Sequence, residues 1–101
     1  MANLRVVLTL AAERDLDALF DYIAGDSGID RAEAVLRRIN ETATNLAVFP
    51  RIGRVRPDLD GAPRVFALWP WLIIYEPLPA DDGIVVWRVL DGRRDLPPLV
   101  G

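Results

Sequence analysis

The sequence of 101 residues contains no cysteine and no histidine, and all of its 12 basic residues are arginine. A chain without cysteine forms no disulfide, and without either residue it lacks the usual ligands of zinc. Its acidic residues also lack the spacing of a calcium-binding loop, so we expect neither a metal site nor a cofactor. Because arginine keeps its proton at neutral pH, it binds anions well but is a poor general acid or base.

Long hydrophobic runs are missing as well. The apolar stretches are far shorter than the roughly 20 residues that cross a bilayer. The residues that follow Met1 lack the basic region, apolar core and cleavage site of a signal peptide. We therefore expect a soluble protein of the cytoplasm that makes no membrane contact. The length of 101 residues fits a single domain, residues 1–101.

Apolar residues, by contrast, are abundant at 51% of the sequence. Because so small a domain cannot bury all of them, we expect an exposed apolar patch, which usually marks a partner site. The net charge of −3 is unfavourable for general nucleic-acid binding. Arginines nevertheless gather at positions 51, 54 and 56 and at positions 93 and 94. These clusters indicate either a local basic face or ordinary solvated surface charges.

The first part of the chain changes from one periodicity to another. Apolar residues alternate with others over residues 4–10, which predicts a strand. From Ala12 to Ile23 the apolar residues recur at helical spacing, and Gly25 is a natural place for this helix to end.

A second helix is predicted to open at Asp30. Glu33 follows three positions later, which is the spacing of a capping box. Pro50 disfavours helical geometry in the residue before it, so the helix should end near Val48. Since only a few residues join the two helices, we expect them to form an antiparallel hairpin.

The remaining sequence predicts a loop followed by three strands. The loop covers residues 51–63, and the strands cover residues 64–69, 71–76 and 84–90, with Pro70 in a tight turn. Consecutive strands with short connections form an antiparallel meander. The order β-α-α-β-β-β therefore predicts an α+β fold with a helical hairpin packed on one face of an antiparallel sheet.

Four short motifs follow one another in this framework. They are Phe20-Asp21-Tyr22-Ile23, Ile52-Gly53-Arg54-Val55-Arg56-Pro57, Trp71-Leu72-Ile73-Ile74-Tyr75 and Val89-Leu90-Asp91-Gly92-Arg93-Arg94-Asp95-Leu96. Their order and spacing resemble the RelE/ParE toxin superfamily of type II toxin–antitoxin systems from about Leu4 to Leu96.

The resemblance implies a growth-inhibiting toxin of the kind found in plasmid stabilization systems. A co-encoded antitoxin protein neutralises such toxins in a heteromeric complex by laying an extended, partly helical segment over them, which fits the apolar excess of this chain. Relatives of the RelE type cut messenger RNA on the ribosome, whereas relatives of the ParE type poison DNA gyrase.

Metal-free RNA cleavage needs a base, an acid and a cation. RelE-like nucleases usually carry a tyrosine near the C-terminus, but residues 96–101 of this chain contain no group that transfers a proton. Asp91 replaces the histidine often found before Gly-Arg-Arg, and we interpret Asp91-Gly92 as a turn. A carboxylate beside Arg93 should be ion-paired. Tyr75, with its apolar neighbours, is interpreted as a sheet residue.

We therefore favour a ParE-like toxin that binds DNA gyrase and has no catalytic residue of its own. The candidate target-binding residues are Arg51, Arg54, Arg56, Arg64, Arg93 and Arg94. One alternative is a ribosome-dependent mRNA endoribonuclease in which Arg64, Arg88 and Arg93 stabilise charge. The other is a non-toxic relative that binds only its antitoxin. Trp69, Trp71 and Trp87 are either platforms for stacking bases or core and partner contacts.

Overall fold

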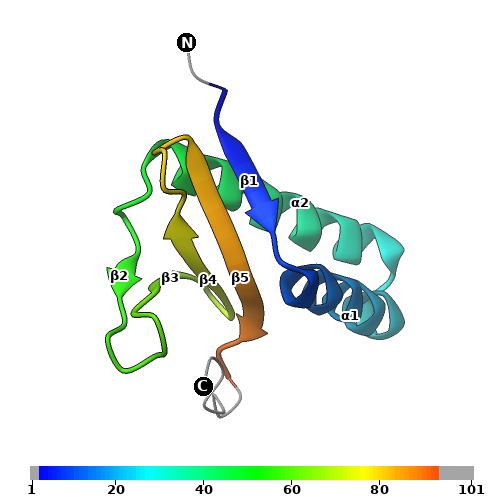
Figure 1. Ribbon diagram of the computed structural model, residues 1–101. Coiled ribbons are helices and arrows are strands. Elements are labelled where there is room, and N and C mark those ends of the chain that lie inside the picture. Colours follow the sequence, from blue (N-terminus) through cyan, green and yellow to red (C-terminus); the bar gives the residue numbers. More distant parts are fainter. Residues whose placement is uncertain (1–2, 94–101) are drawn as a thin grey trace.

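The computed structural model describes residues 3–93, which form two helices and five strands (Figure 1). In chain order these are β1 (Arg5–Leu8), α1 (Leu10–Ser27), α2 (Ile29–Val48), β2 (Arg54–Val55), β3 (Arg64–Leu68), β4 (Trp71–Pro77) and β5 (Gly83–Asp91). The helices form a hairpin that packs on one side of a single sheet. This arrangement confirms the predicted α+β class.

The sheet has the order β1-β5-β4-β3-β2. The three strands β3, β4 and β5 form the predicted antiparallel meander. β1, however, pairs with β5 in parallel, with Arg5 opposite Gly83, so the sheet is mixed and the prediction of a purely antiparallel sheet was wrong. An alternation of apolar residues predicts a strand but carries no information on the direction of its neighbour.

The segment predicted as a loop contains the short strand β2. Its two residues, Arg54 and Val55, pair with Val65 and Arg64 of β3. A strand of two residues is too short to produce a periodic signal, which is why the sequence predicted only a loop here.

The junction between the helices differs from the prediction by a few residues. α1 continues through Gly25, and the chain turns at Gly28, whose φ of 94° lies in the region that favours glycine. α2 therefore begins at Ile29, and no side chain caps it, so the predicted capping box at Asp30 is absent. At the other end of α1, the hydroxyl of Thr9 accepts a hydrogen bond from the Ala12 amide.

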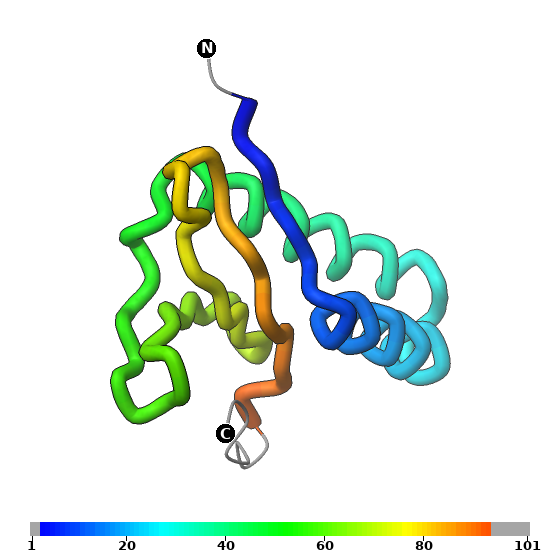
Figure 2. The backbone as a smooth tube through the Cα atoms, viewed as in Figure 1, coloured from blue at the N-terminus to red at the C-terminus, as the bar shows by residue number. Residues whose placement is uncertain are grey.

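The hydrophobic core lies between the helical hairpin and the sheet. The largest fully buried members of this cluster are Leu46 from α2, Ile73 and Tyr75 from β4, and Ile84 and Val86 from β5. The smooth backbone trace shows β5 running beside β1, although the two strands lie at opposite ends of the sequence (Figure 2). Neither described helix is long and apolar enough to cross a membrane.

Candidate target-binding site

The loop after α2 is anchored by the buried hydroxyl of Tyr75. This hydroxyl accepts a hydrogen bond from the Gly53 amide at 2.8 Å and donates one to the Pro50 carbonyl at 2.7 Å. Burial raises the pKa of the Tyr75 phenol, which keeps it protonated and able to donate. Tyr75 is fully buried, as expected of a sheet residue, and its hydroxyl is engaged in holding the loop.

Arg64 holds the same loop from the sheet side. Its guanidinium donates to the Gly53 carbonyl at 2.8 Å and to the Arg51 carbonyl at 3.3 Å. A predicted target-binding residue therefore has a structural task, since it satisfies backbone carbonyls that the loop cannot pair internally.

Two of the predicted arginines extend freely from the anchored loop. Arg51 and Arg54 are exposed, and neither forms an ion pair within residues 3–93. Arg56 is paired with Asp58 at 2.7 Å. This hydrogen bond raises the pKa of the Arg56 guanidinium, which stays charged.

Exposed apolar side chains accompany these charges. Phe49, Ile52 and Val55 are 57%, 52% and 43% exposed, respectively. We call residues 49–56 the arginine loop. Apolar groups and unpaired guanidiniums on one fixed loop are well suited to bind a protein surface that carries carboxylates.

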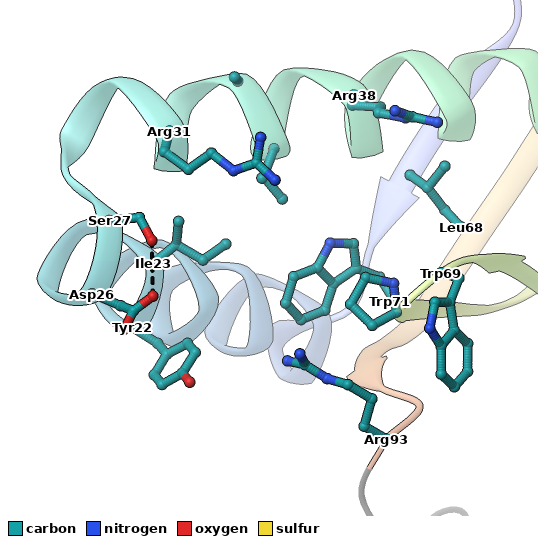
Figure 3. Close-up of a pocket in the computed structure, with 13 residues that line it drawn as sticks. Tyr22, Ile23, Asp26, Ser27, Arg31, Arg38, Leu68, Trp69, Trp71 and Arg93 are labelled. Atoms are coloured by element: carbon teal, nitrogen blue, oxygen red, sulfur yellow. Dashed lines mark hydrogen bonds between the residues drawn. The ribbon is translucent and has the colours of Figure 1, made fainter.

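Arg93 occupies a different place, just beyond β5. Its guanidinium pairs with Asp91 at 2.7 Å and lies 5.8 Å from the ring centre of Trp71 (Figure 3). The hydrogen bond to Asp91 raises the pKa of Arg93. The ion pairing expected for a carboxylate beside Arg93 is thus confirmed, and the Gly92 amide donates to the Pro70 carbonyl in the expected turn.

The structure separates the predicted arginines into two groups. The register of β4 places Arg64 opposite Tyr75 at one end and Asp91 opposite Trp71 at the other. The arginine loop and Arg93 therefore do not form one continuous face. Arg94 lies outside the described residues.

An ion pair that the sequence analysis missed connects α1 to β5. The carboxylate of Asp15 accepts from Arg88 at 2.7 and 2.9 Å and from the Val89 amide at 3.0 Å. Arg88, a charge-stabilising residue in the nuclease alternative, is thus already bound, and its pKa is raised by the bond to Asp15. The two residues are 73 positions apart, so no local pattern could reveal the pair.

The carboxylate of Glu76 on β4 is also engaged. Glu76 accepts a hydrogen bond from the indole of Trp87 at 3.3 Å. Among residues 3–93, no group of three or more histidine, cysteine or acidic side chains is arranged to hold a metal ion. The described residues can therefore bind a partner through the charges of Arg51 and Arg54 and through apolar contact, whereas Tyr75, Glu76 and Arg88 are engaged in hydrogen bonds of the fold.

Comparison with known sequences points to one family. The profile of the family described as "ParE toxin of type II toxin-antitoxin system, parDE" matches residues 6–96. The chain is 38% identical over 97 residues to Toxin ParE3 of Caulobacter vibrioides, which covers 96% of this chain and 95% of that protein. It is 29% identical over 92 residues to Toxin ParE1 of Mycobacterium tuberculosis, covering 91% of this chain and 93% of the relative.

A solved structure shares the fold. It is described as the chromosomal ParDE TA system from P. aeruginosa, and it superposes with a TM-score of 0.71 at 22% sequence identity. The superposition covers 87% of this chain and 95% of the solved one. At this sequence identity the likeness shows the fold alone.

Proposed function

Because the chain belongs to the family of ParE toxins of type II toxin–antitoxin systems, we propose that it stops growth by binding DNA gyrase. The toxin would hold gyrase in its DNA-cleaved state and break no bond itself. The observation that carries this proposal is the family match over residues 6–96. The side chains of Tyr75, Glu76 and Arg88 all form hydrogen bonds within the fold, which supports a binding mechanism over an RNA-cleaving one.

We further propose that the toxin acts in the cytoplasm as a single domain and is neutralised there by a co-encoded antitoxin. The support is the amount of apolar surface left open. The exposed large side chains are Leu4, Val7, Leu10, Tyr22, Ile29, Val48, Phe49, Ile52, Val55, Trp69 and Trp87. A monomer of this size rarely exposes so many unless a partner covers them.

The proposed contacts to gyrase or its DNA come from the six predicted arginines. Arg51 and Arg54 are the foremost of these, since they are exposed and unpaired within the described residues. Arg56 can exchange its exposed partner Asp58 for a target group at little cost, because exposed ion pairs are weak. The side chain of Arg93 is 53% exposed, but that of its partner Asp91 is only 17% exposed, so this exchange costs more. Arg64 contributes by holding the loop, and Arg94 belongs to the proposal by its sequence position.

The first test is to induce the chain alone in tightly repressed bacteria and follow labelled thymidine and methionine uptake. We expect DNA synthesis to fall first and purified gyrase to accumulate cleaved DNA in the presence of the protein. An earlier fall of protein synthesis would identify the chain as a ribosome-dependent nuclease. Unimpeded growth would identify a non-toxic relative.

A matched pair of variants tests the contact surface. Arg51→Ala combined with Arg54→Ala should reduce gyrase poisoning about tenfold or more, because two charged contacts at about 1 kcal/mol each are lost. Arg14→Ala combined with Arg37→Ala removes the same charge from exposed helix positions and should leave poisoning unchanged. Equal poisoning by both double variants would exclude the arginine loop as the gyrase contact.

A further inference from the structure

A hollow of about 460 Å³ lies between the helical hairpin and the turn that joins β3 to β4 (Figure 3). Its walls come from Tyr22, Ile23, Asp26 and Ser27 of α1, from Arg31, Ala34, Val35 and Arg38 of α2, from residues 68–71, and from Arg93. The volume lies in the range of small-molecule sites. Of the proposed gyrase contacts within residues 3–93, Arg93 alone lines the hollow, so the hollow shares one arginine with the proposed gyrase surface.

The charge of the residues that line the hollow is net positive in a chain of net charge −3, although one of the three arginines, Arg93, is already paired with Asp91. Three arginines line it against one acid, Asp26, whose carboxylate accepts a hydrogen bond from the Ser27 hydroxyl at 2.8 Å. The guanidiniums of Arg31 and Arg38 form no ion pair or hydrogen bond within residues 3–93. Unpaired guanidiniums at the wall of a cavity are a ready site for phosphate oxygens.

Aromatic rings accompany these charges. Figure 3 shows the ring of Trp71 in the middle of the hollow, with Arg31 on the α2 side and Arg93 on the opposite side. Tyr22 stands across from it on α1 and is 56% exposed. The ring of Trp71 is only 9% exposed and has the Arg93 guanidinium over it, so Tyr22 provides the open aromatic surface of the hollow. A flat base that enters the hollow can stack on Tyr22, and such stacking tolerates any base.

The spacing of the free arginines indicates more than one phosphate. Arg31 and Arg38 are seven positions apart on α2, which corresponds to two helical turns and about 10 Å along the axis. Both therefore lie on the same side of the helix and can hold two separate anionic groups at once. Successive phosphates on either side of a stacked base provide such a pair.

Comparison with a second hollow, of about 320 Å³, favours a nucleotide rather than an apolar peptide as the ligand of the first hollow. The second hollow lies near β1, and among its lining residues Asn40 alone has a polar side chain. This apolar lining suits an apolar segment of a partner protein. In the first hollow, six of the 13 lining residues are charged or carry a hydroxyl group.

From the charge, the rings and the spacing we propose that the first hollow binds a nucleotide unit of single-stranded nucleic acid. Its phosphates lie against Arg31 and Arg38, and its base lies against the exposed ring of Tyr22. The same chemistry also admits a free nucleotide, which offers fewer phosphate contacts. The two sites share Arg93, but Arg31, Arg38 and Tyr22 are not among the proposed gyrase contacts, so variants at these three residues test the hollow separately from gyrase binding.

The test is the fluorescence anisotropy of a labelled eight-nucleotide thymidine strand titrated with the purified chain at about 50 mM salt. We expect Arg31→Ala combined with Arg38→Ala to weaken binding about tenfold or more and to lower the slope of log K against log salt by about one to two. Tyr22→Ala should weaken binding about fivefold or more without changing that slope. Arg37→Ala, an exposed charge on the same helix outside the hollow, is the matched control.

Competition experiments distinguish a nucleic-acid strand from a free nucleotide as the ligand. Competition by thymidine monophosphate as effective as competition by the unlabelled strand assigns the site to a free nucleotide. No binding of either probe up to about 100 µM protein, the upper range of non-specific affinities, overturns the proposal. Equal weakening by Arg37→Ala and the double variant also overturns it. Circular dichroism of each variant verifies the fold.

Discussion

At the residue scale, the close approach of Gly53 to Tyr75 determines how the arginine loop is held. A Cβ atom added at Gly53 would lie against the Tyr75 hydroxyl and ring, so the position has no room for a side chain. The absence of a side chain lets the Gly53 amide reach the phenol directly. The two hydrogen bonds of the Tyr75 hydroxyl thereby hold the arginine loop, because the two-residue strand β2 forms too short a ladder to hold it alone.

Tyr75→Phe tests this role. It leaves the buried Gly53 amide unsatisfied, and we expect a loss of about 1–3 kcal/mol in the free energy of unfolding in urea. Tyr22→Phe removes a hydroxyl that has no hydrogen-bond partner in residues 3–93, and it should change stability by less than about 0.5 kcal/mol. An equally stable Tyr75→Phe protein would contradict the assigned role.

The same residue predicts a pH dependence. Burial raises the pKa of Tyr75 in the folded protein above its unfolded value of about 10. The stabilisation is therefore complete below pH 10 and is lost as the pH rises through the folded-state pKa. Urea unfolding from pH 8 to pH 11 should show the advantage of the wild type over Tyr75→Phe shrinking at the alkaline end. A constant difference would argue against a buried, protonated phenol.

At the scale of elements, β1 is attached to the sheet through a glycine. Gly83 has a φ of 138°, and a Cβ atom there would collide with the backbone of Arg5. The parallel pairing of β1 and β5 begins at this pair. Farther along β5, beyond the end of β1, Asp15 of α1 accepts from the Val89 amide. The edge of β5 is thus covered first by a strand and then by a side chain.

Two glycine substitutions should move stability in opposite directions. Gly83→Ala should cost about 2–3 kcal/mol and speed the hydrogen exchange of the β1 amides, because the backbone of Arg5 must move away. Gly25→Ala, in the interior of α1 with nothing within 4 Å, should gain about 0.5–1 kcal/mol. Unchanged exchange in the Gly83 variant would show that β1 docks without the glycine.

At the scale of the whole molecule, a small core coexists with much open apolar surface. The largest fully buried side chains are few, and all of them except Ile74 belong to the cluster that fills the layer between hairpin and sheet. Side chains such as Trp69, at 68% exposed, remain outside this layer. A ligand that covers such surface in the folded state stabilises the fold by mass action.

The co-encoded antitoxin should therefore raise the melting temperature of the toxin. At a free concentration of one hundred times the dissociation constant, the gain is about 2.7 kcal/mol. For a domain of this size it corresponds to a rise of about 10 °C or more in differential scanning fluorimetry. An unchanged melting temperature in saturating antitoxin would contradict the proposed partnership.

Local sequence patterns determined the family of this protein and most of its secondary structure. Periodicity placed the two helices and the three strands of the meander, and the order of short motifs identified the family, because both signals lie within a few neighbouring residues. The same patterns placed α1 two residues short, since the sequence cannot show that Gly25 is tolerated inside a helix while Gly28 makes the turn.

Only the tertiary structure decided which groups meet. The parallel pairing of β1 with β5, the pair of Asp15 with Arg88 and the anchoring of Gly53 by Tyr75 join residues 78, 73 and 22 positions apart. Folding likewise separated the predicted arginines into two groups and placed Arg31, Arg38 and Tyr22 at the wall of one hollow. The physical reason is that burial and hydrogen bonding act between neighbours in space, whereas a sequence pattern records neighbours along the chain.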